Sequence, residues 1–135
     1  MNLPDIPSDR EVFEGEIATY WFEGDILVAR SKPVRRTVKL IAGNVELVKR
    51  ISGGERVPLL IYLVDSPVPD KETRKFSAKM VPEIYSAMAM ISRSSLARMI
   101  MRAVFALNKP PIPMRSFGSA EEAKKWLAAS AADKR

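Results

Sequence analysis

The sequence predicts an α/β fold with a mixed, mostly parallel sheet of about five strands and about four helices. The first observation behind this prediction is the unbroken apolar run Leu59–Val64. A strand without alternation must be covered on both faces, so the stretch 57–64 is predicted to be a central strand with helices on both sides. The second observation is that helix-like and strand-like stretches alternate from 34 to 127, which implies parallel strands joined by right-handed crossovers.

The length of 135 residues fits one domain with a substantial core. We expect residues 1–13 to form an extended lead-in, residues 14–129 a single domain, and residues 130–135 a frayed tail. The apolar and charged fractions, 47% and 28%, are ordinary for a soluble protein. No apolar run reaches the roughly 20 residues of a membrane span, and the first residues lack a secretory signal, so we expect a cytoplasmic location.

The chain contains no cysteine and no histidine. This composition excludes thiol catalysis, disulfides, zinc sites of the usual ligand types and histidine general bases. The net charge of +6 favours an anionic partner, but lysine and arginine are spread over every segment. Such a spread is typical of solvated helix faces and argues against nucleic-acid binding.

Two strand-like stretches, 16–22 and 25–30, flank the dipeptide Glu23-Gly24. Aromatic and β-branched residues on both sides of a short glycine turn predict an antiparallel hairpin. Tyr20 and Trp21 are expected to pack against the opposite strand.

A helix is predicted over 34–52, after Lys32-Pro33 and before Gly53-Gly54. Its apolar arc is wide, because Leu40, Leu47 and Ile51 form a second stripe beside the first. Arg36 is assigned to the polar remainder of the helix. Two interpretations of the second stripe stay open: it contacts a neighbouring helix of the same chain, or it contacts another protein.

The central strand ends at Asp65, and a proline-containing loop leads to Asp70, a good N-cap residue. A helix is predicted over 71–81, closed by Pro82, and a strand over 85–91. The next predicted helix, 93–107, leaves some apolar and basic residues outside its core arc. These residues have the composition of an interface patch and comprise Arg98, Met101, Arg102 and Phe105.

The last part of the chain predicts an edge strand over 114–117 and a final helix that begins with the capping box Ser119–Glu122. That helix is expected to carry Ala123, Trp126 and Leu127 inward. With these elements in place, the chain resembles the STAS domain of anti-sigma-factor antagonists and sulfate-transporter tails. The resemblance rests on 57–65, 69–73, 109–117 and 119–127, and it covers about residues 14–128.

The resemblance implies a non-catalytic regulatory or protein-interaction module, as in a group of small bacterial STAS-like proteins. Antagonist-type STAS domains carry an Asp-Ser-Ser-Gly-like phosphoacceptor where this chain has Pro69–Thr73. The candidate switch or partner loop therefore comprises Asp65, Ser66, Asp70 and Thr73. The alternative interpretation is that Asp65 and Ser66 hold the turn while Thr73 faces solvent.

The sequence shows no nucleophile with a base and no phosphate loop, and the carboxylates Asp65 and Asp70 are too few for a magnesium or calcium site. We therefore expect no catalysis, no cofactor and no metal. Two functional hypotheses remain. One is an interaction module that forms a homodimer or binds a partner protein. The other is a domain for a small apolar ligand or lipid, suggested by five adaptable methionines: Met80, Met88, Met90, Met99 and Met101.

Overall fold

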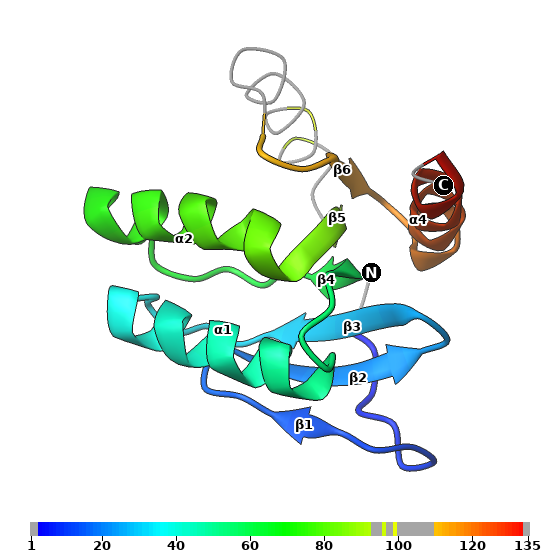
Figure 1. Ribbon diagram of the computed structural model, residues 1–135, viewed down its shortest axis with the longest axis horizontal. Coiled ribbons are helices and arrows are strands. Elements are labelled where there is room, and N and C mark those ends of the chain that lie inside the picture. The colour runs from blue at the N-terminus through cyan, green and yellow to red at the C-terminus, as the bar shows by residue number, and fades with distance from the viewer. Residues whose placement is uncertain (1–2, 93–95, 97–98, 100–109, 134–135) are drawn as a thin grey trace.

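The computed structural model describes residues 3–92, 96, 99 and 110–133, and Figure 1 shows a sheet with helices on both faces. The strands of the sheet are β1 (Phe13–Glu14), β2 (Ala18–Glu23), β3 (Ile26–Ser31), β4 (Val57–Tyr62), β5 (Tyr85–Ile91) and β6 (Met114–Phe117). The helices of the described part are α1 (Val38–Ile51), α2 (Lys71–Ile84) and α4 (Ala120–Asp133). The spatial order of the strands follows the chain, from β1 to β6.

The sheet is mixed and mostly parallel, as the sequence predicted. β1, β2 and β3 pair antiparallel, whereas β3, β4, β5 and β6 pair parallel. The sheet has one strand more than predicted, because Phe13, the last residue of the predicted lead-in, and Glu14 form β1 and pair with β2. The predicted hairpin is confirmed, and Gly24 makes its turn with a positive φ of 63°.

β4 is the central strand, between β3 and β5. Its neighbouring residues Leu59 and Leu60 point to opposite faces, and both are almost fully buried. Leu59 belongs to the core cluster that α1 and α2 cover. Leu60 belongs to the cluster that α4 covers with Ala123 and Leu127. Figure 1 shows α1 and α2 side by side, with α4 apart from them, so the prediction of helices on both faces is confirmed.

Several element boundaries differ from the prediction. α1 begins at Val38 because Thr37 is its N-cap, and the Thr37 side chain accepts a hydrogen bond from the Leu40 amide. α2 continues past Pro82 to Ile84, so the prediction that this proline closes the helix is wrong. A proline removes one helical hydrogen bond, and here only two helical residues follow it. β4 ends at Tyr62, two residues before Val64.

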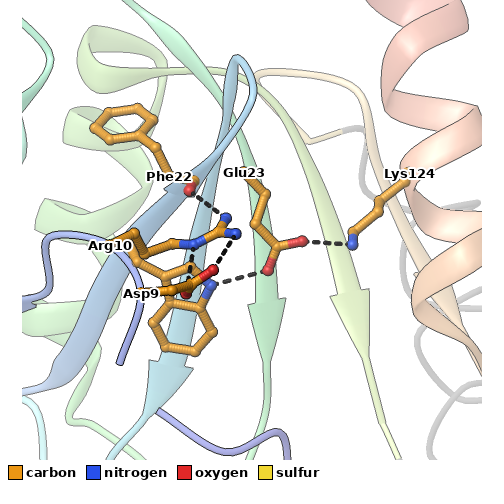
Figure 2. Close-up of polar contacts among 6 residues, drawn as sticks. Asp9, Arg10, Phe22, Glu23 and Lys124 are labelled. Atoms are coloured by element: carbon orange, nitrogen blue, oxygen red, sulfur yellow. Dashed lines mark hydrogen bonds and ion pairs between the residues drawn. The ribbon is translucent and has the colours of Figure 1, made fainter. Parts of the chain in front are cut away.

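Side chains attach the lead-in and α4 to the hairpin. Arg10 Nη1 donates to the Phe22 carbonyl at 3.0 Å, and Figure 2 shows Glu23 pointing toward Lys124 of α4. The Glu23 carboxylate accepts from Lys124 Nζ at 2.5 Å and from the Trp21 indole N–H at 2.8 Å. Burial alone would raise the pKa of Glu23, but the hydrogen bonds from Lys124 and Trp21 outweigh it and lower that pKa.

The pair Glu23–Lys124 should therefore stabilise the fold in a pH-dependent way. Because the pKa of Glu23 is lowered in the folded state, its contribution is present above the unfolded pKa of about 4.3 and is lost as the pH falls through the folded value. A double-mutant cycle with Glu23→Gln and Lys124→Met should give a coupling free energy of about 0.5–1 kcal/mol at pH 7 by urea unfolding.

The matched control is the neighbouring pair Glu121–Lys125, in which both side chains are about four-fifths exposed. The same cycle on that pair should give a coupling near zero. A coupling at Glu23–Lys124 that stays constant as the pH falls from 7 until the protein unfolds in acid, or that equals the control, would contradict this assignment.

Candidate functional site

A cavity of about 860 Å³ lies between the sheet and the two helices α1 and α2. We call it the sheet–helix cavity. Residues of β2, β3, β4, β5 and β6 line the sheet side of the cavity, its floor, and residues after β4 and before β6 extend its wall. Its apolar lining includes Ile41, Leu59, Ile61, Val81, Met88 and Met114. The cavity therefore occupies the same face of β4 as the Leu59 cluster, not the face that α4 covers.

The residues of α2 explain why this face contains a cavity. Only Thr73 and Ile84 of α2 are buried, one near each end of the helix. Between them the wall of the cavity is formed by smaller or more flexible side chains, among them Ser77, Ala78 and Met80. Ala78 is exposed although it lines the cavity, so the cavity is open to solvent along α2.

A group of hydroxyl and amide side chains lies in the wall of the cavity. The Tyr20 hydroxyl donates a hydrogen bond of 2.7 Å to Asn44 Oδ1 of α1. Tyr85 belongs to the same group, and both Tyr20 and Tyr85 are buried. Burial is the main cause that raises the pKa of both phenols, and Tyr20 raises that of Tyr85 further. The prediction that Tyr20 packs within the sheet is confirmed, and its hydroxyl has a polar role besides.

Arg36 is one residue of this site that the sequence placed wrongly. The prediction put it on the polar face of a helix, but it lies before the N-cap Thr37 and lines the cavity. Nη1 donates to the carbonyls of Lys32 and Val34, at 2.7 Å each. Nη2 donates to the Ile17 carbonyl at 3.0 Å and to Ser31 Oγ at 3.2 Å. All four acceptors are neutral, and burial lowers the pKa of Arg36.

The predicted switch loop divides into two parts. Ser66 and Thr73 line the cavity, whereas Asp65 and Asp70 do not. Thr73 is 2% exposed, so the expectation that it faces solvent is wrong, because the first turn of α2 turns it toward the sheet. Asp65 is exposed, and its carboxylate accepts no hydrogen bond from the residues that the structure describes.

Asp70, in contrast, caps α2. Its Oδ1 accepts from the Thr73 amide at 2.8 Å, and hydrogen bonds from the side chain and backbone of Thr73 lower its pKa. Two arginines hold the loop that precedes it. Arg35 Nη1 donates to the Val68 carbonyl at 3.1 Å, and Arg74 Nη1 donates to the Pro69 carbonyl at 2.9 Å. The predicted N-cap is therefore confirmed.

The second stripe of α1 lies partly within the fold. Leu47 and Ile51 pack against the core cluster of this face, and α1 contacts α2. A Cβ atom on Gly15 would lie only 2.9 Å from Leu47 Cδ2, so Leu47 is held against the segment between β1 and β2. Leu40 is half-buried outside that cluster. The other candidate interface residues, Arg98, Met101, Arg102 and Phe105, lie outside the described residues.

Only some of the methionines that suggested a ligand pocket line the cavity. Met80 and Met88 line the cavity, together with Met114, which the sequence had placed only on an edge strand. Met90 is buried in the adjoining core. Met99 is 59% exposed, and Met101 is outside the described residues.

The described residues contain no group of three or more His, Cys, Asp or Glu side chains that could hold a metal ion. None of their helices is both long and apolar enough to cross a bilayer.

No curated protein matches the chain. Among solved structures, the chain is similar to an uncharacterized protein of the DUF3478 family with a SpoIIAA-like fold, from Shewanella loihica. The identity is 14%, the TM-score is 0.57, and the likeness covers 87% of this chain and 91% of that chain. It shows the fold alone, and it confirms the predicted STAS-like fold. Because the family model matches residues 20–131, from β2 to near the end of α4, the chain belongs to the family described as Domain of unknown function (DUF7793).

Proposed function

We propose that this protein is a non-catalytic binding domain that takes up a small, largely apolar molecule in the sheet–helix cavity. The observation that carries the proposal is the cavity itself, whose volume of about 860 Å³ is within the range of small-molecule sites, about 300–1,000 Å³. Its wall combines a predominantly apolar surface with a few polar groups at fixed positions, as ligand sites do.

The chemical character of the wall side chains supports the same function. Met80, Met88 and Met114 have flexible, polarisable thioethers that adapt to ligands of different shape. The floor, in contrast, is the rigid central part of the sheet, with Leu59 fixed between β3 and β5. A rigid floor with an adaptable wall selects for apolar character and size rather than for one exact outline.

The interaction module stays a second prediction. Its remaining described features are Leu40 and the loop after β4, in which Val68 is 70% exposed. Such a loop is a possible contact for a homodimer or for a partner protein in a regulatory role. Sedimentation equilibrium tests self-association: a dimer at micromolar concentration that Val68→Asp or Leu40→Asp dissociates would support it, and a monomer throughout would contradict it.

The binding function predicts saturable binding of a neutral apolar dye such as Nile red, with one site per chain. Ala78→Phe should weaken that binding about tenfold, because the ring enters a cavity wall, and fluorescence titration measures the change. The control is Ala128→Phe, the same substitution at an exposed helical alanine of α4, which is not part of the cavity wall. Absence of saturable binding, or equal effects of the two substitutions, would contradict the proposal.

The two hydroxyl residues of the loop differ in burial, so they should differ in how well they tolerate a negative charge. Thr73→Glu should destabilise the fold by about 2 kcal/mol or more, since it places a carboxylate at a site that is 2% exposed. Ser66→Glu, at an exposed position, should change the unfolding free energy by less than about 0.5 kcal/mol. Equal stabilities of the two variants in urea would show that Thr73 accepts a phosphate-like charge without unfolding.

A further inference from the structure

The charged side chains that the described residues contribute to the wall of the sheet–helix cavity are all of one sign. Two cationic side chains line it, Arg36 and Arg74, and no carboxylate is among the described residues that line it. Arg74 is exposed at the rim and lies near Asp70, whose charge partly balances it. Arg36 is partly buried, and no described acidic residue forms an ion pair with it. Among the described residues, the wall of the cavity therefore has one inner cation, Arg36, without a counter-ion.

A neighbouring cation, Lys32, does have a partner. Lys32 forms an ion pair with Glu14 and donates to the Gly15 carbonyl at 2.6 Å. Glu14 is thus engaged, and its pKa is lowered by the hydrogen bonds from Lys32 and Thr19. Lys32 is thus paired with a carboxylate, whereas the described acceptors of Arg36 are all neutral. One of these acceptors is the backbone carbonyl of Lys32.

The hydrogen bonds of Arg36 fix its guanidinium and leave one donor. Both N–H bonds of Nη1 and both of Nη2 have acceptors, on Lys32, Val34, Ile17 and Ser31. The Nε–H donates to none of the described residues. A held cation with a remaining donor, in a wall of low polarity, attracts an anion more strongly than the same group in water.

We propose, on the basis of the binding function above, that the ligand is an amphipathic acid whose single carboxylate binds at Arg36 while its apolar body fills the cavity. One inner cation matches one negative charge, which favours a carboxylate over a doubly charged phosphate. Asn44 lies in the same wall, and since its Oδ1 accepts from the Tyr20 hydroxyl, its side-chain N–H groups serve as donors to the carboxylate oxygens. The apolar lining on β4, β5 and β6 accommodates the body of the acid.

The direct test compares head groups on the unaltered full-length chain. Dodecanoate, dodecanol and dodecyltrimethylammonium, each below its micelle concentration at pH 7.5, displace Nile red in a competition titration. The inference predicts that dodecanoate binds at least about tenfold more tightly than dodecanol, and that the ammonium compound binds most weakly. Equal affinities of the acid and the alcohol, or tighter binding of the cation, would overturn it.

Substitution of Arg36 tests whether this residue causes the preference for the acid over the alcohol. Arg36→Gln should remove the advantage of dodecanoate over dodecanol while Nile red and dodecanol still bind. Arg50→Gln, at an exposed position in the last turn of α1, should leave the advantage unchanged. If Arg36→Gln does not fold, the head-group series on the unaltered chain decides the question alone. Binding of the alcohol and acid with equal affinity contradicts only this inference, whereas failure of Nile red and of all three amphiphiles to bind contradicts the binding function as well.

Discussion

The burial of β4 on both faces is the constraint on which the rest of the structure depends. Leu59 and Leu60 are adjacent, so a strand that carries both of them needs cover on each side of the sheet. α4 supplies a close cover on one side, with Ala123 and Leu127 fully enclosed. α1 and α2 cover the other side less closely, because α2 contributes buried side chains only near its ends. The cavity is the consequence of this difference between the two faces.

The polar side chains on the two faces of the sheet differ as well. On the α4 side, the carboxylate of Glu23 meets Lys124 and the Trp21 indole, and the group closes on itself. On the cavity side, Arg36 has neutral acceptors only, and the Tyr20–Asn44 pair lies in the wall. A group that is satisfied within the fold needs no ligand, whereas a partly buried cation without a counter-ion gains free energy from an anion. Arg36 is thus distinguished from the Glu23 group because no described residue of the chain supplies it with a counter-ion.

The sequence predicted the fold well and the site poorly, for physical reasons. Strand periodicity and turn residues are local signals, so the hairpin, β5, β6 and the start of α4 agree with the prediction. The extra strand β1 has only two residues and carries no such signal. Arg36 was misplaced because the periodicity of α1 extends past its true start, and Thr37 is the signal that could have corrected it. The cavity arises from the fit between α2 and the sheet, which no local pattern encodes.

Methionine methyl signals offer the most direct test of the central claim, that the space between the sheet and α2 is a binding site. Met80, Met88 and Met114 line the cavity, whereas Met99 is exposed and is not among its lining residues. In methyl-labelled protein titrated with dodecanoate, the account predicts saturable shifts of the three cavity methyl signals and a constant Met99 signal. Unchanged cavity signals, or a shift confined to Met99, would contradict it.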